Sequence, residues 1–198
     1  SRSPEITWWR AIVDALLAEY EQPKANEEVK RAALEALASA NHPRVPELIR
    51  NAYEDGSNEM QLSALFAMGL NADDRWLSIV SDEMESPSAD FRAEAARAAG
   101  AIGNPEAIDG LEQLLHDEDV EVAIAAVYAL GQIGSERATE LLNRLADDPA
   151  YEDLYDAIDE ALEEMDWMGG EFDLLALPDD EDEDENDDFA IDIDPRAN

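Results

Sequence analysis

The stretch VAIAAVYALGQIGSER, residues 122–137, decides the fold because its pattern also occurs upstream in the chain. Residues 91–106 read FRAEAARAAGAIGNPE, with alanines, glycines and aliphatic residues in register at a spacing of 31. Offsets of three, four and seven place the repeated positions on one side of a helix. Small side chains on that side let neighbouring helices approach closely, so the pattern predicts helices that stack.

Four helices share these columns. The columns hold Val29, Met60, Phe91 and Val122; Ala33, Ala64, Ala95 and Ala126; Ala36, Ala67, Ala98 and Ala129; and Ala38, Gly69, Gly100 and Gly131. The helices between them carry larger residues, as in AIDGLEQLL at 107–115. Each unit is therefore a helix pair whose apolar stripe becomes buried only when the pairs stack.

Turn residues mark the ends of these helices. The column before each second helix holds Asn26, Ser57, Ser88 and Asp119, which are all good N-cap residues. Gly103 and Gly134 stand where second helices are expected to end. The sequence predicts about five pairs over residues 1–168, followed by an acidic, largely disordered tail over residues 169–198.

The stretch LLHDEDVEVAIAAVYALGQIG, residues 114–134, resembles HEAT repeats, especially the short form named after phycobilin lyases. The resemblance covers most of the chain. It implies an all-α, right-handed α-solenoid of HEAT-like helix pairs. It also implies a protein-binding scaffold, because most members of this class bind proteins, although some help to attach or detach bilins on antenna proteins.

The charge is far from balanced: 50 acidic residues against 13 lysines and arginines give a formal net charge of −37. Such a surface repels the phosphates of nucleic acid and of anionic membranes, so we expect neither as a partner. It favours a basic protein partner. An acid-rich surface with only Lys24 and Lys30 as lysines also suits a salty cytosol, and this alternative stays open.

No apolar run approaches the roughly 20 residues of a membrane span, and no signal-peptide pattern is present. We therefore expect a cytoplasmic location. The chain begins with Ser1 rather than methionine, which suggests a processed or excised fragment. The sequence does not indicate the oligomeric state.

The predicted tail contains a block of like charges, DDEDEDENDD at 179–188, which favours disorder. It is either a solvating tail or an interaction arm. In the second case its apolar residues would be the anchors, namely Phe172, Leu174, Leu175 and Leu177.

Patterns of catalytic and metal-binding residues are absent from the sequence. His42 and His116 lack a second histidine or cysteine at ligand spacing, which disfavours a zinc site. No glycine-rich phosphate loop or nucleophile elbow occurs. We therefore predict no catalytic residue, no metal and no cofactor, and a protein that is not an enzyme.

One further set of columns points roughly opposite the alanine core, toward the expected concave face. A solvated face should be polar there, but these columns and the fifth unit hold Leu62, Phe66, Leu70, Arg97, Ile124, Tyr128 and Tyr155. Either curvature or the tail buries these residues, or they form a groove for a basic protein segment.

The sequence thus predicts a non-catalytic protein-binding scaffold, such as an adaptor, chaperone or assembly factor, that uses the concave face and the acidic tail. The alternative is an accessory subunit of a bilin lyase-type enzyme. A bilin needs cations for its propionates, and Arg92 and Arg97 form the basic pair on a second helix inside the stack. A mimic of nucleic acid that occupies a basic protein is a third hypothesis.

Overall fold

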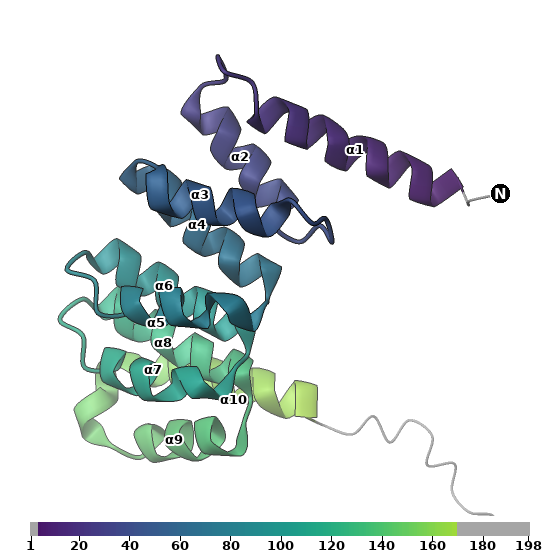
Figure 1. Cartoon of the computed structure of the whole chain (residues 1–198). Coiled ribbons are helices and arrows are strands. Elements are labelled where there is room, and N and C mark those ends of the chain that lie inside the picture. The colour runs from purple at the N-terminus through teal and green to yellow at the C-terminus, as the bar shows by residue number, and fades with distance from the viewer. Residues whose placement is uncertain (1–3, 170–198) are drawn as a thin grey trace, which may run out of the picture. The chain divides into compact units, whose positions relative to one another are not determined.

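The computed structural model describes the backbone of residues 4–169 and the side chains of residues 8–167. Within that span the chain forms ten α-helices, three 3-10 helices and no strand (Figure 1). The chain divides into two units, residues 1–168 and residues 169–198. The predicted disorder of the tail and its apolar motif lie outside the described residues.

The helices follow one another as pairs. The pairs are α1 (Pro4–Tyr20) with α2 (Glu27–Leu37), α3 (Val45–Asp55) with α4 (Asn58–Asn71), α5 (Leu77–Glu83) with α6 (Ala89–Ile102), α7 (Ile108–Leu114) with α8 (Val120–Ile133), and α9 (Glu136–Ala146) with α10 (Tyr155–Gly169). The 3-10 helices η1 (Asp74–Trp76), η2 (Pro105–Ala107) and η3 (Pro149–Leu154) precede α5, α7 and α10. The predicted all-α solenoid of helix pairs is confirmed.

The second helices of successive pairs contact one another, α2 with α4, α4 with α6 and α6 with α8. The small-residue columns make these contacts. A Cβ atom added at Gly69 would lie 3.0 Å from the Cα atom of Ala98, and one at Gly100 would lie 2.7 Å from that of Ala129. Larger residues would not fit there, which explains why these positions are strictly alanine or glycine.

One column position does not behave as predicted. Ala67, Ala98 and Ala129 are buried, but Ala36 is exposed. In this column each residue packs against the second helix of the preceding pair, as Ala98 does against Gly69. Among the described residues α2 is the first second helix, so no such helix covers Ala36.

The predicted helix caps are confirmed except for Ser88. Asn26, Ser57 and Asp119 accept hydrogen bonds from backbone N–H groups of the following turn. Ser88 has nearly the same backbone conformation as Asp119, but its side chain makes no cap hydrogen bond. Its hydroxyl stands one atom closer to the backbone than the carboxylate oxygens of aspartate, and therefore does not reach the same N–H group.

Glycine is favoured where two second helices end in a left-handed conformation. Gly103 ends α6 with φ 75°, and Gly134 ends α8 with φ 60°. The equivalent residue after α4 is Ala72, which takes the same left-handed conformation with φ 49°. Glycine populates this region without the steric cost that a Cβ atom brings.

Candidate functional site

A cavity of about 420 Å³ opens between the second helices α4, α6 and α8. Its wall comes mainly from the N-terminal half of α6 and the first turn of α8. The lining residues are Leu62, Ala89, Asp90, Ala93, Glu94, Arg97, Asp119, Glu121 and Val122. We call it the α6–α8 pocket. Its size is that of a site for a small molecule or a single long side chain.

The structure brings Leu62 and Arg97 of the predicted groove together in this pocket. Phe66 and Leu70 are exposed, with 42% and 44% of their surface accessible. The remaining predicted residues, Ile124, Tyr128 and Tyr155, are half-buried and pack against the core. Of these, Tyr128 donates a hydrogen bond from its hydroxyl to Glu160 of α10. Whether these side chains bind a protein stays a prediction.

Glu94 is the functional candidate that sequence reasoning missed. Its side chain is only 17% exposed. One carboxylate oxygen, Oε1, is buried with no hydrogen-bond partner among the described residues. The other, Oε2, lies 3.4 Å from Nη1 of Arg97, one turn later on α6. Burial raises the pKa of Glu94, while Arg97 acts in the opposite direction.

A signal for Glu94 was present in the repeat itself. The residues at its position in the other second helices are Ala32, Ser63 and Ala125. Of these, Ser63 and Ala125 are buried, so the column is one of small core residues. A glutamate there places a charge where the neighbouring repeats place a methyl or hydroxyl group, and this departure marks the site.

In the preceding repeat, the polar side chain at this position has hydrogen-bond partners within the fold. Ser63 is 2% exposed and takes part in two hydrogen bonds. It accepts one from Nε of Arg31 at 2.8 Å and donates one to Oε1 of Glu35 at 2.7 Å. Glu94 has no comparable network among the described residues, since Arg97 reaches one of its oxygens at a long distance and the other oxygen has no partner there.

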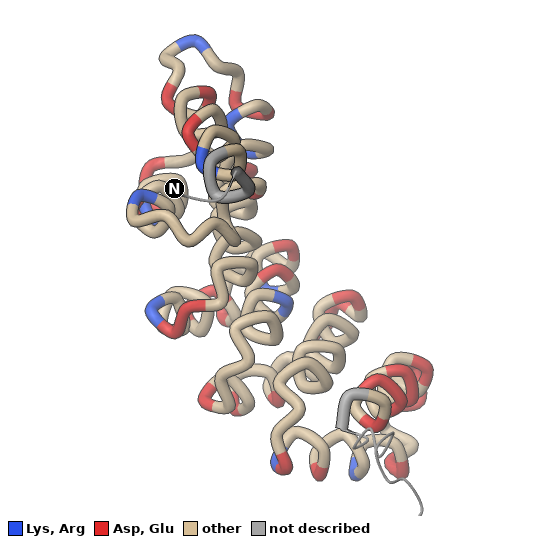
Figure 2. Tube along the Cα trace, turned by 90° about the vertical axis from the view of Figure 1, so that its right-hand side faces the viewer, with Lys and Arg blue, Asp and Glu red and all other residues tan. Residues whose placement is uncertain are grey.

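The α6–α8 pocket is acidic overall. Asp90, Glu94, Asp119 and Glu121 line it together with one cation, Arg97. The Arg97 side chain is 54% exposed, so solvent screens much of its charge. Acidic positions also recur along the whole described stack (Figure 2). The pocket therefore favours a positively charged group.

Arg92 does not serve as a binding cation. It lies on α6 and makes a bidentate ion pair with Asp117, with Nε–Oδ2 2.6 Å and Nη2–Oδ1 2.7 Å. The two side chains are 13% and 7% exposed. Arg92 and Arg97 therefore do not form the predicted basic pair for bilin propionates, because Asp117 of the following repeat already neutralises Arg92.

The two histidines lie apart and have other contacts. His42 Nδ1 accepts a hydrogen bond from the backbone N–H of Arg44, and a ring nitrogen of His116 lies 3.0 Å from the hydroxyl of Tyr151. In the part of the chain that the structure describes, no three histidine, cysteine or acidic side chains form a group suited to a metal ion. No helix in that part has both the length and the apolar character needed to cross a membrane.

Comparison with known families gives one match. Residues 77–163, which run from α5 into α10, match the sequence model described as HEAT repeats. The resemblance to HEAT repeats is confirmed over these residues. Assignment to the short form named after phycobilin lyases stays a prediction.

Two curated relatives carry the same name. Deoxyhypusine hydroxylase of mouse (Mus musculus) is 31% identical over 113 residues, which are 56% of this chain and 37% of that protein. Deoxyhypusine hydroxylase of human (Homo sapiens) is 28% identical over 123 residues, 61% of this chain and 41% of that protein. The match thus spans well under half the length of either relative.

Solved structures also match this chain, among them that of human deoxyhypusine hydroxylase in complex with glycerol. It is 18% identical, with 78% of this chain and 74% of that chain covered and a TM-score of 0.47.

These relatives contradict two predictions. The chain was expected to be a non-catalytic scaffold, with a subunit of a bilin lyase-type enzyme as the alternative, and was expected not to be an enzyme. The curated relatives are named as an enzyme of a different kind, a hydroxylase. Both predictions are therefore wrong.

Proposed function

We propose that this chain supplies the substrate-binding part of an enzyme that modifies an amine-bearing side chain on a protein. The observation that carries the proposal is Glu94, a largely buried carboxylate that lines the α6–α8 pocket and whose Oε1 atom has no hydrogen-bond partner among the described residues. In this proposal the ammonium group of the substrate binds between Glu94 and the acids at the rim.

The names of the relatives support the proposed class of substrate. They act on deoxyhypusine, an amino acid whose side chain carries amines. Amines of this kind are protonated at neutral pH, and a carboxylate is the natural partner for them. An ammonium group bound beside Glu94 would compensate the charge of this largely buried carboxylate, which is otherwise unfavourable.

The shape of the pocket suits a long side chain with a charged end. Leu62, Ala93 and Val122 give it an apolar part that can contact methylene groups. Glu94 and Asp90 give it a charged part. Long cationic side chains bind in this way, with the stem on apolar surface and the head on polar groups.

Hydroxylation needs a group that activates dioxygen, commonly a metal held by histidines and carboxylates. The described residues do not fit such a group, because they contain no suitable set of three or more donors. We therefore assign no oxidation step to them. Their proposed role is to bind and orient the side chain and to neutralise its charge.

A basic protein as substrate is part of the proposal. The acidic groups around the pocket and the formal net charge of −37 attract a basic segment and speed its encounter with the site. We propose that the predicted basic partner binds this same surface and that it is the substrate of the enzyme.

The test is a binding measurement with a peptide that contains one deoxyhypusine residue. Titration calorimetry on the full chain should show binding, and Glu94→Gln should weaken it roughly tenfold or more, because a charge-assisted hydrogen bond contributes about 1.5–3 kcal/mol. Glu140→Gln is the matched control. It removes the same charge at an exposed position of α9, away from the pocket, and should leave affinity unchanged.

A second readout concerns the modification itself. In an extract of the native cells that lacks this chain, wild-type protein should restore the gain of one oxygen atom on the peptide, measured by mass spectrometry. Glu94→Gln should restore less. Equal affinity of Glu94→Gln and wild type for the peptide would show that the proposed pocket is wrong.

A further inference from the structure

A second cavity of about 310 Å³ lies one repeat further along, between the first turn of α8 and η3. It shares none of its lining with the α6–α8 pocket and has a different character. Leu115, Ala123 and Leu154 form an apolar floor, and each is at most 5% exposed. Val120 stands beside them with 48% of its surface exposed, which is high for an aliphatic residue. We call this cavity the Tyr151 pocket.

An aromatic wall closes one side of the Tyr151 pocket. The rings of Tyr151 and His116 have centroids 5.4 Å apart and are tilted by 45°. The Tyr151 hydroxyl lies 3.0 Å from Nε2 of His116, so a hydrogen bond fixes the two rings together. Tyr151 also leaves helical geometry, with φ −115° and ψ 25° inside η3. The Tyr151 ring is therefore held by His116, at a point where the backbone departs from helical geometry.

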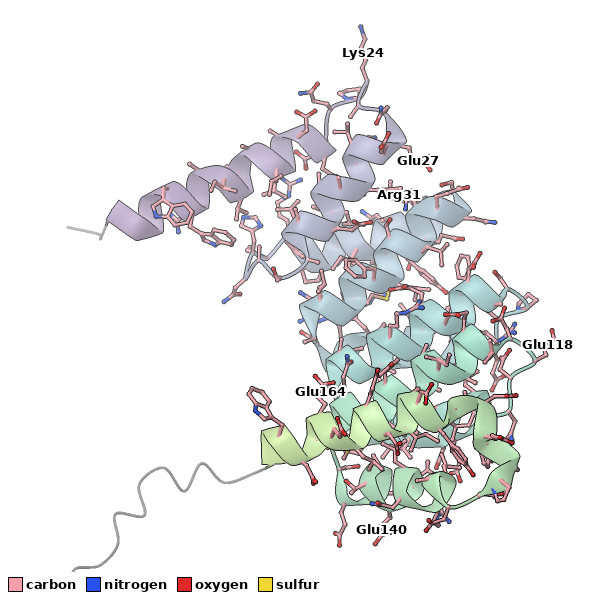
Figure 3. The ribbon with its side chains drawn as sticks, turned by 180° about the vertical axis from the view of Figure 1, so that it is seen from behind. Lys24, Glu27, Arg31, Glu118, Glu140 and Glu164 are labelled. Atoms are coloured by element: carbon pink, nitrogen blue, oxygen red, sulfur yellow. The ribbon has the colours of Figure 1, made fainter. Side chains whose placement is uncertain are left out.

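Carboxylates stand at the rim of the Tyr151 pocket. Asp117 is not available to a ligand, since both of its carboxylate oxygens accept hydrogen bonds from Arg92. Glu118 and Asp153 are exposed, and neither enters an ion pair with any described residue. Figure 3 shows Glu118 on the loop that precedes α8, with its side chain directed away from the helices. Two carboxylates are thus available to a ligand.

We infer that the Tyr151 pocket binds an arginine side chain presented by a basic protein segment. The methylene stem fits the apolar floor, the planar guanidinium stacks on the Tyr151 ring, and Glu118 and Asp153 accept its N–H groups. Guanidinium stacks on aromatic rings and pairs with carboxylates in a way that an ammonium group does not. The acidity of the chain supplies the charge complementarity for such a segment.

This site does not depend on the proposed function. If both are correct, one basic segment places an amine in the α6–α8 pocket and an arginine in the Tyr151 pocket. Neighbouring helices pack about 8–10 Å apart, and an extended chain advances about 3.3 Å per residue. The two side chains would then stand roughly three residues apart in the bound segment.

The test uses the full chain and three short capped peptides, Gly-Arg-Gly, Gly-Lys-Gly and Gly-citrulline-Gly, at about 0.15 M salt. Backbone and methyl NMR signals should shift around Val120, Ala123 and Leu154 on addition of the arginine peptide. Lysine should bind several-fold more weakly, and citrulline, which keeps the shape but lacks the charge, should give no comparable shift.

Matched variants separate the pocket from general charge attraction. The double variant Glu118→Gln, Asp153→Asn should weaken arginine binding roughly three- to tenfold, as expected for two partly exposed ion pairs. Glu152→Gln, next to Asp153 but outside the lining, should have no effect. Tyr151→Phe should retain binding because the ring remains, whereas Tyr151→Leu should lose it.

Equal binding of the arginine and citrulline peptides would overturn the inference. So would wild-type affinity of the double variant, or an equal loss in Glu152→Gln. Glu94→Gln keeps the Tyr151 pocket intact and should bind the arginine peptide normally. Failure of the inference can therefore be distinguished from failure of the proposed function.

Discussion

At the scale of single residues, Glu94 combines a structural cost with the binding role that we propose for it. A buried carboxylate oxygen without a partner is unfavourable. The equivalent position one repeat later is Ala125, which is fully compatible with the packed core. The fold therefore does not require an acid there. A site that binds a cation does require one, because the ligand compensates the buried charge.

The same reasoning predicts opposite effects of one change on stability and binding. Glu94→Ala should raise the free energy of unfolding by about 1 kcal/mol, since it removes the unpaired buried oxygen and introduces the best helix former. It should also abolish binding of the deoxyhypusine peptide. Denaturant unfolding followed by circular dichroism measures the first effect. A destabilised variant would mean that Glu94 is a structural residue.

Arg92 and Asp117 illustrate the opposite case, a largely buried ion pair that is satisfied. Asp117 accepts from Arg92 on both oxygens and from the backbone N–H of Asp119. The side-chain hydrogen bond with Arg92 is the main reason that the pKa of Asp117 lies below its usual value. The same bond raises the pKa of Arg92. The pair joins α6 to the loop of the next repeat.

Asp117→Asn should destabilise the protein by about 1–3 kcal/mol at neutral pH, because Arg92 loses its charged partner. The folded state depresses the pKa of Asp117, so its stabilisation is full above the unfolded pKa of about 3.9 and is lost as pH falls through the folded value. The difference between wild type and variant should persist from pH 7 to about pH 4 and shrink below it. A difference that is constant down to pH 2 would contradict this role.

At the scale of helices, the close approach of successive second helices limits the size of the side chains between them. Gly69 and Gly100 face the Cα atoms of Ala98 and Ala129 on the next second helix. Overpacking such a contact typically costs about 1–3 kcal/mol. The column position of a residue is therefore not sufficient to assign it to the core, since the second helix that packs on that column must also be present to cover it.

Ala98→Leu and Ala36→Leu are a matched pair of substitutions that tests whether a covering helix is needed. Both residues occupy the same column, but Ala98 is 2% exposed and Ala36 is exposed to solvent. Ala98→Leu should lower the free energy of unfolding by about 1–3 kcal/mol, and Ala36→Leu should change it by less than about 0.5 kcal/mol. Thermal unfolding of the two variants measures the difference. Equal melting temperatures would show that the register is wrong.

Local periodicity predicted the helix pairs, the glycine ends at Gly103 and Gly134 and most of the caps. The repeat also placed Arg97 on the face that carries the pocket. Contacts between repeats could not be predicted from local periodicity. Arg92, for example, pairs with Asp117, which lies 25 residues later in the loop of the next repeat. The column of Glu94 holds small residues in the other repeats, which could have identified it. Acidic residues are so frequent in this sequence, however, that a single glutamate is not a distinctive signal.

At the scale of the whole molecule, charge is the dominant feature. A formal net charge of −37 on 198 residues produces strong self-repulsion, which destabilises a compact state. The charge also draws basic segments to the surface. The composition thus lowers stability and favours encounter with the proposed class of substrate.

Salt should therefore stabilise the fold and weaken substrate binding. The Debye length falls from about 30 Å at 0.01 M to about 3 Å at 1 M, so repulsion between acids is screened. The melting temperature should rise with sodium chloride over this range, while affinity for the deoxyhypusine peptide should fall. A continued rise in multimolar potassium chloride would favour adaptation to a salty cytosol. A melting temperature that does not change with salt would contradict the repulsion argument.

The most direct test of the proposed site is a titration of the Glu94 carboxyl group by NMR, with and without the deoxyhypusine peptide. In the free protein burial should hold the pKa of Glu94 above its ordinary value. A bound ammonium group should lower that pKa, because a nearby cation favours the charged carboxylate. An ordinary pKa in the free protein, or a raised pKa that the peptide leaves unchanged, would contradict the assignment of Glu94 as the substrate-binding group.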